Sequence, residues 1–313
     1  MSRSDRIQAR SLGERLLGGL YLDLNRDYRN TVFVAGSGRS GTTWLSDVIN
    51  YRREYRFIFE PFHPGRVGIC RHFNSKQYLR PDDRREEFLA PARKILSGAV
   101  RSPWTDRFHR RFLARRRLIK DIRANLLLGW LRANFPGMPM VLLMRHPCAV
   151  AASRMALGWQ DNLVETMRQQ DLVAGFLRPM EAEIRAAKTP FERHVFLWCI
   201  DNYAPLMQLA EDEVHLVFYE DLIAHPEREL SPLFAALGTD LDTTVYQKMK
   251  SPSPLSRKIA AHSSPNDWWR RIEKAELRRA VEILALFGLD HVYGEDPMPD
   301  AEAARAMMRS RAG

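Results

Sequence analysis

The feature that most constrains the fold is a glycine-rich turn between a short apolar run and a helical pattern. Residues 31–35 read TVFVA, residues 36–41 read GSGRSG, and residues 42–50 read TTWLSDVIN. The apolar run predicts a strand buried on both faces of a parallel sheet. Glycine allows several backbone N–H groups to approach one phosphate, and the N-terminus of the next helix adds its positive dipole end. The order strand, turn, helix therefore predicts a phosphate-binding loop.

The position of the cation in this loop indicates which phosphate compound binds. In the usual ATP- or GTP-binding loop, a Lys follows the last Gly and reaches the β- and γ-phosphates. Here Thr42 follows Gly41, and the cation, Arg39, lies inside the loop. No predicted strand ends in the apolar run and Asp that would hold Mg²⁺ in such proteins. We therefore expect a phosphate ligand without a metal, and a P-loop nucleotide kinase or NTPase is the alternative.

Short β-rich runs alternate with longer helical patterns, which is typical of a parallel sheet covered by helices. Strands are expected at residues 31–35, 56–59, 118–120, 140–144 and 214–219. Helices are expected at residues 42–51, 124–134, 149–159, 164–178, 191–210 and 273–287. The predicted fold class is α/β, a three-layer sandwich with a central parallel sheet of about five strands and a P-loop-like phosphate-binding loop.

No repeat or linker divides the sequence, so we expect a single domain over residues 1–313. Residues 1–29 are expected to form an N-terminal helical extension, and residues 291–313 a C-terminal tail. The sequence contains no signal peptide and no apolar run long enough to cross a bilayer, which predicts a cytoplasmic protein.

The net charge and the cysteines narrow the class of ligand. The formal net charge of +10 favours anionic ligands, and no recognised nucleic-acid motif accompanies it. The three cysteines, Cys70, Cys148 and Cys199, do not have metal-ligand spacing. We therefore expect neither a metal site nor a nucleic-acid partner.

An arginine-rich segment, residues 101–117, concentrates part of the positive charge. Six of its arginines fall within eleven positions, namely Arg107, Arg110, Arg111, Arg115, Arg116 and Arg117. One interpretation is a solvated basic face. The other is a wall or lid that attracts an anionic acceptor, or a contact that holds the protein at the periphery of a membrane. The sequence leaves these alternatives and the oligomeric state open.

The residues Arg39-Ser40-Gly41-Thr42-Thr43-Trp44-Leu45 resemble the 5′-phosphosulfate loop of sulfotransferases that use 3′-phosphoadenosine 5′-phosphosulfate (PAPS). Carbohydrate and protein-tyrosine sulfotransferases often have Arg at the position of Arg39, whereas cytosolic members have Lys. The resemblance extends over roughly residues 30–290 in the order and spacing of the motifs. It implies that the donor binds to Gly38, Arg39, Ser40, Gly41, Thr42 and Thr43, and that the product is adenosine 3′,5′-bisphosphate (PAP).

A second group of motifs is similar to the part of the family that binds the 3′-phosphate and the adenine. Arg145 ends a predicted strand, and Ser153 follows eight residues later, as in the family's 3′-phosphate pair. Tyr219, in the segment YEDL, is implied to lie near the adenine. Trp44 matches an aromatic residue that stacks on adenine in cytosolic members, and a core tryptophan is the alternative.

Residues 246–267 are rich in Ser, Pro and Lys and predict a loop. Within this loop, Arg257 and Lys258 resemble residues that close over the 3′-phosphate. Ile259 stands where the family has Gly, so the match is incomplete. The resemblance implies that the loop folds back over the nucleotide.

Sulfuryl transfer needs a cation for the leaving phosphate and a base for the proton of the acceptor. The resemblance makes Arg39 the expected cation, with Lys120 as a second. The strand that ends at Lys120 lacks the His that is the base in cytosolic members. Glu60, in the segment Phe-Glu-Pro, resembles the carboxylate base of carbohydrate-type members, and desolvation is expected to raise its pKa. His63 is the fallback base, and Asp121 a weaker one.

These features predict a sulfotransferase that moves a sulfuryl group from PAPS to a hydroxyl of a carbohydrate, glycolipid or small-metabolite acceptor. The alternative enzyme is a P-loop kinase or NTPase, which would bind ATP with Mg²⁺. The alternative without catalysis is a nucleotide-binding interaction protein, which would bind PAP but show no turnover.

Overall fold

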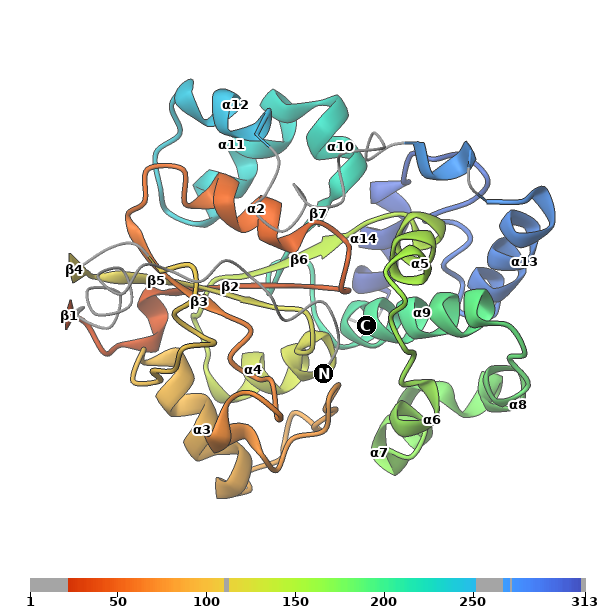
Figure 1. Ribbon diagram of the computed structural model, residues 1–313, viewed down its shortest axis with the longest axis horizontal. Coiled ribbons are helices and arrows are strands. Elements are labelled where there is room, and N and C mark those ends of the chain that lie inside the picture. The colour runs from red at the N-terminus through yellow and green to blue at the C-terminus, as the bar shows by residue number, and fades with distance from the viewer. Residues whose placement is uncertain (1–21, 110–112, 252–266, 271, 311–313) are drawn as a thin grey trace.

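A parallel sheet of five strands forms the centre of the molecule (Figure 1). The computed structural model describes residues 22–109, 113–251, 267–270 and 272–310. The strand order is β3-β5-β2-β6-β7, and every neighbouring pair is parallel. The strands are β2 (Thr31–Gly36), β3 (Tyr55–Phe59), β5 (Arg116–Asp121), β6 (Met140–Met144) and β7 (His215–Phe218). The predicted α/β class and its central parallel sheet are confirmed.

Two hydrophobic cores lie on opposite faces of this sheet. Alternate residues of β2 belong to different cores, with Val32 and Val34 on one face and Phe33 and Ala35 on the other. This double burial is the reason for the continuous apolar character of the strand. Figure 1 shows helices above and below the sheet, which makes three layers.

The helices divide between the two faces. One core contains side chains of α2 (Thr42–Ile49), α10 (Tyr219–Ala224), α11 (Pro226–Ala236) and α12 (Thr244–Met249). The other contains side chains of α3 (Glu86–Leu96), α4 (Leu128–Asn134), α5 (Pro147–Ala156), α9 (Pro190–Gln208), α13 (Lys274–Ala285) and α14 (Ala301–Arg309). The sequence pattern did not predict α3, α10, α11, α12 or α14.

The single helix predicted for residues 164–178 is wrong. The segment instead contains α6 (Leu163–Thr166), α7 (Gln170–Leu172), a π-helical turn at Val173–Leu177, a 3-10 turn at Arg178–Met180 and α8 (Glu181–Arg185). Gln169 interrupts the pattern with an extended backbone, φ −78° and ψ 96°. Its side chain accepts a hydrogen bond from the Tyr78 N–H and donates one to the Lys76 carbonyl, both at 2.8 Å. The break therefore depends on contacts with a distant segment.

The arginine-rich segment is not a uniform solvated face where the structure describes it. Arg117 is fully buried and pairs with Asp23 of β1 (Leu22–Asp23), with 2.9 Å between Nη1 and Oδ1. Strand β1 pairs with β4 (Leu113–Ala114) in a small second sheet. Arg116 is half-buried and donates to the Leu237 carbonyl at 2.7 Å. Arg110 and Arg111 lie outside the described residues.

The ends of the described chain pack against the body. Residues 1–21 of the predicted N-terminal helical extension lie outside the described residues, and Tyr28–Asn30 form a 3-10 turn. Near the C-terminus, α14 packs against α9, and the Tyr293 hydroxyl donates to Glu220 at 2.9 Å. Among the helices of the described residues, none is both long enough and apolar enough to span a bilayer.

Candidate functional site

The glycine-rich loop connects β2 to α2 at the carboxyl end of the sheet (Figure 1). A Cβ atom on Gly36 would lie 2.6 Å from the Leu143 carbonyl oxygen, and one on Gly41 would lie 2.8 Å from the Tyr219 ring. Gly41 also has a φ of 101°, which a side chain would disfavour. Glycine at these positions is thus required by close packing and by backbone conformation.

Two features of the loop fit a bound phosphate. The Ser40 hydroxyl oxygen is buried without a hydrogen-bond partner among the described residues. Thr42 and Thr43 begin α2, whose first N–H groups have no partner within the helix. A buried polar atom without a partner is costly, so a ligand oxygen near Ser40 would stabilise the loop.

A buried ionic network supports the loop. Asp201 of α9 accepts a hydrogen bond from the Ser37 hydroxyl at 2.9 Å and forms an ion pair with Lys76. Arg154 of α5 donates to the Gly38 carbonyl at 3.1 Å and lies 3.6 Å from the same Asp201 carboxylate. Burial lowers the pKa of Lys76 to about 8. Three distant segments thus fix the loop through one carboxylate.

The two predicted phosphate sites lie in direct contact. Arg39 Nε donates to the Ser153 hydroxyl at 3.0 Å, and Arg145 Nη1 donates to the Arg39 carbonyl at 3.3 Å. The Arg145 guanidinium also lies 4.4 Å from the centre of the Tyr219 ring. Burial, followed by the charges of Arg145 and Arg154, lowers the pKa of Arg39 to about 10, so Arg39 stays protonated at neutral pH. The arrangement concentrates positive charge suited to an anionic ligand.

Trp44 packs behind Tyr219. Its ring meets the Tyr219 ring edge to face, with 5.5 Å between centroids, and its Nε1 donates to the Met249 carbonyl at 3.1 Å. With 8% of its surface exposed, Trp44 is a core residue in this structure, and Tyr219 lies between it and Arg145. Arg257 and Lys258 lie outside the described residues.

Glu60 and Lys120 meet because β3 and β5 are neighbours and both end at the same edge of the sheet. Lys120 Nζ lies 2.6 Å from Glu60 Oε1, and Arg123 Nη1 lies 2.6 Å from Oε2. Glu60 has a positive φ of 42°, and its N–H donates to the Lys120 carbonyl at 2.7 Å. The structure therefore brings the predicted base together with the second predicted cation.

The expectation that desolvation raises the pKa of Glu60 is wrong for this structure. Burial acts in that direction, but the charges and hydrogen bonds of Lys120 and Arg123 outweigh it, and the pKa lies below its ordinary value. Arg123 belongs to none of the sequence motifs, so its contact with Glu60 could not be expected from them. Glu60 is consequently held as a carboxylate.

The two fallback bases have different surroundings. His63 accepts a hydrogen bond from the Gly65 N–H at 3.2 Å, and burial, followed by Arg123, lowers its pKa to about 4. Asp121 is fully buried and accepts hydrogen bonds from the Phe62 and Arg123 N–H groups at 2.8 Å. Burial and the charge of Glu60 raise the pKa of Asp121 to about 6. Its contacts give Asp121 a structural role in the turn after β3.

Trp159 covers the loop and was also missed from the sequence. Its side chain is 39% exposed, and a Cβ on Gly38 would lie 2.7 Å from its ring and 3.2 Å from Ile122. The helix predicted for residues 149–159 would include Trp159, whereas α5 ends at Ala156 and leaves Trp159 outside the helix. The side chain thus belongs to the wall between the loop and the end of β5.

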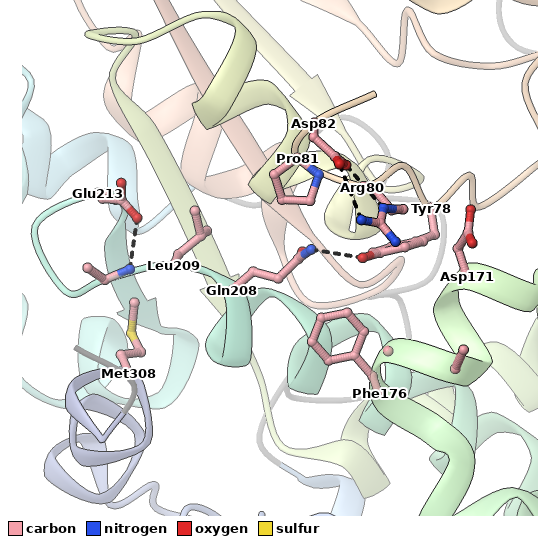
Figure 2. Close-up of a pocket in the computed structure, with 13 residues that line it drawn as sticks. Tyr78, Arg80, Pro81, Asp82, Asp171, Phe176, Gln208, Leu209, Glu213 and Met308 are labelled. Carbon is pink, nitrogen blue, oxygen red and sulfur yellow. Dashed lines mark hydrogen bonds and ion pairs between the residues drawn. The ribbon is translucent and has the colours of Figure 1, made fainter. Parts of the chain in front are cut away.

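A separate hollow of about 700 Å³ lies beside the C-terminal end of α9 (Figure 2). Figure 2 shows Gln208, whose amide donates to the Tyr78 hydroxyl at 3.2 Å, and Arg80 paired with Asp82. None of the described residues predicted to bind the nucleotide lines this hollow. Within the described part of the chain, no cluster of three His, Cys, Asp or Glu side chains is arranged for a metal ion.

One family model and one curated relative are similar to this chain. Residues 31–243 match the model of a family described as the sulfotransferase family. The nodulation protein NoeE of Sinorhizobium fredii (strain NBRC 101917 / NGR234) is 24% identical over 305 residues, covering 90% of this chain and 70% of the relative.

Among solved structures, the sulfotransferase domain of the Synechococcus PCC 7002 olefin synthase has a TM-score of 0.47 and 18% identity, covering 82% of this chain and 94% of that one. Mouse sulfotransferase SULT7A1, solved in complex with PAP, has a TM-score of 0.45 and 14% identity, covering 95% of this chain and 92% of that one.

Proposed function

The chain belongs to the sulfotransferase family, and we propose that its donor is PAPS and its acceptor a hydroxyl group of a carbohydrate, glycolipid or small metabolite. The observation that carries this proposal is the contact between the phosphate loop and the second phosphate site. Arg39 donates to Ser153, and Arg145 donates to the Arg39 carbonyl. A nucleotide with anionic groups on both its 5′ and 3′ oxygens fits two adjoining cationic sites.

Each part of PAPS has candidate partners in this chain. The loop from Gly38 to Thr43 and the start of α2 would hold the 5′-phosphosulfate. Arg145 and Ser153 would hold the 3′-phosphate, and Tyr219 would lie near the adenine. Arg257 and Lys258 stay proposed as residues that close over the 3′-phosphate. The buried Ser40 hydroxyl supports this assignment, because no described residue satisfies it.

When bound, PAPS supplies a sulfuryl group on a phosphate leaving group. Arg39 keeps its positive charge at neutral pH and would stabilise negative charge that develops at the loop. Glu60 is ionised and would take the proton of the acceptor hydroxyl. Lys120 holds Glu60 as a carboxylate, and it is a second cation at the same edge of the sheet.

A calorimetric titration tests the donor assignment. We expect PAP to bind more tightly than ATP with Mg²⁺, because the site has two sets of phosphate partners and no Lys after the last Gly of the loop. Arg145→Ala should weaken PAP binding by about tenfold to a hundredfold, since a hydrogen bond to a charged group contributes roughly 1.5–3 kcal/mol.

Arg115→Ala is the matched control, because it removes one exposed arginine. Arg115 lies just before β5, at the amino-terminal ends of the strands, whereas the phosphate loop lies at their carboxyl ends. Tighter binding of ATP with Mg²⁺ would reject the PAPS assignment and favour a kinase or NTPase. The cytoplasmic location, a peripheral membrane contact through residues 101–117 and the single-domain organisation stay predictions.

A further inference from the structure

We infer that Arg66 and Arg107, stacked on Trp104 beside Glu60, form an anion-binding subsite for the acceptor, and that the acceptor is an acidic saccharide, one with a carboxylate or phosphate group. This inference rests on the proposed function, because it places the reacting hydroxyl of the acceptor at Glu60. It assigns a role to part of the arginine-rich segment and narrows the class of acceptor.

Trp104 contacts residues 59–63, the stretch of chain that contains the proposed base Glu60. Its Nε1 donates to the Glu60 carbonyl at 3.1 Å, and its ring meets the Phe59 ring edge to face with 5.3 Å between centroids. The His63 ring packs edge to face against it at 5.1 Å. The indole is thus positioned from β3 and the turn that follows it.

Two guanidinium groups lie over this indole. The central carbon of Arg107 is 4.5 Å from the Trp104 ring centre, and that of Arg66 is 5.4 Å away. Arg107 also lies 5.2 Å from the Phe59 ring and 5.3 Å from the Phe108 ring. Stacking orders a guanidinium, and the five N–H donors of its planar fork suit carboxylate and phosphate oxygens.

The backbone of this part of the arginine-rich segment is attached to the sheet. The Phe59 N–H at the end of β3 donates to the Thr105 carbonyl at 2.9 Å. Asp106 lies 3.2 Å from the buried Arg56 of the same strand. Arg107 is therefore presented from a fixed turn next to the base, which favours a wall of the acceptor site over a mobile lid.

Positively charged side chains also lie between this subsite and Glu60, the proposed base. Arg66 and Arg123 both act on His63, and both oppose its protonation. The carboxylate of Glu60 is already bonded to Lys120 and Arg123. An acidic group on the acceptor would bring negative charge to this surface while its hydroxyl reaches Glu60.

The test compares saccharides that differ in charge. Tetragalacturonate and maltotetraose are titrated into the protein saturated with PAP, and maltotetraose 1-phosphate forms a third arm. We expect at least one acidic saccharide to bind about tenfold or more tightly than maltotetraose. If tetragalacturonate exceeds maltotetraose in affinity by more than maltotetraose 1-phosphate does, the acidic group is a carboxylate. The reverse order identifies a phosphate. Arg66→Gln and Arg107→Gln should each weaken binding of that saccharide by about fivefold to tenfold and leave PAP affinity unchanged.

Arg115→Gln is the control for net charge, since it removes the same charge from an exposed position just before β5, at the opposite edge of the sheet. Equal affinities for acidic and neutral saccharides, no binding of either acidic saccharide, or an equal loss in Arg115→Gln would overturn the inference. Failure of PAP itself to bind would instead reject the proposed function, so the two failures are distinguishable.

Discussion

Glu60 is a buried carboxylate between two cations, and its replacement by Gln tests the proposed base. The amide keeps the shape of the side chain but cannot take a proton. We expect Glu60→Gln to bind PAP normally and to lose about 10²–10⁴-fold in sulfuryl transfer to any acceptor that the unmodified protein uses. The midpoint of thermal unfolding should also fall, because Lys120 and Arg123 lose their counter-charge.

His63→Ala is the companion variant, since His63 is the fallback base. Loss of transfer in His63→Ala together with full transfer in Glu60→Gln would move the base to the imidazole.

The pH dependence of transfer separates Glu60 from Asp121. A base acts in its deprotonated form, so the rate falls only when the pH drops below the pKa of that base. The pKa of Glu60 lies below its ordinary value of 4.5, whereas that of Asp121 is about 6. At saturating PAPS we expect a constant rate from pH 8 down to about pH 5.5. A midpoint near pH 6 would show that the rate depends on the ionisation of Asp121 and would contradict a profile set by Glu60 alone.

At the scale of residues, motifs in the sequence pointed to local groupings and to Glu60 and Lys120, but not to most contacts between distant segments. The loop, and the proposed pair Arg145 and Ser153, could be proposed from the sequence because each lies within one strand–helix connection. Asp201 was missed because its partners, Ser37 and Lys76, are 164 and 125 residues away. A single sequence carries no signal for such a pairing.

Among the helices, α9 connects both proposed phosphate sites. It carries Asp201, which supports the loop, and Trp198, whose Nε1 donates to the Arg145 carbonyl at 2.9 Å. A capping box fixes its first turn, in which the Thr189 hydroxyl accepts from the Glu192 N–H at 3.1 Å and Glu192 accepts from the Thr189 N–H at 3.0 Å. The position of α9 therefore affects the geometry of both sites.

We expect Thr189→Ala to lower the free energy of unfolding by about 1 kcal/mol, because the Glu192 N–H loses its hydrogen-bond acceptor. Thr243→Ala is the matched control, since Thr243 precedes α12 without a capping hydrogen bond from its side chain. Urea denaturation of both variants measures the difference. Equal losses in the two variants would contradict the role given to the capping box.

At the scale of elements, the apolar run at residues 31–35 was enough to predict the central strand. Local patterns could not reveal that Gln169 interrupts a helix, since the cause is its pair of hydrogen bonds to the chain at Lys76 and Tyr78. The strand predicted for residues 214–219 extends past the observed β7, because Tyr219 is the first residue of α10 and not part of the strand.

At the scale of the whole molecule, Arg117 joins the small sheet to the large one. It lies on β5, pairs with Asp23 of β1, and also donates to the Leu96 carbonyl at 3.1 Å. The sequence pattern treated this residue as part of a basic surface, because charge alone does not reveal burial. Its environment is instead that of a buried ion pair.

We expect Arg117→Ala to lower the free energy of unfolding by about 3–5 kcal/mol, because the buried carboxylate of Asp23 loses a partner. Arg115→Ala, two positions earlier and exposed, should change it by less than about 0.5 kcal/mol. Chemical denaturation distinguishes the two. A small effect in both variants would show that the small sheet does not depend on this pair.

The left-handed backbone at Arg39 and Glu60 has an evolutionary consequence. Among the described residues, the non-glycine positions with positive φ are these two and Arg53. A left-handed conformation costs a non-glycine residue roughly 1–2 kcal/mol, and Arg39 is also surrounded by like charges. Selection for thermostability alone would therefore favour glycine at position 39, and an arginine there would persist only while selection for its proposed role in donor binding opposes that drift.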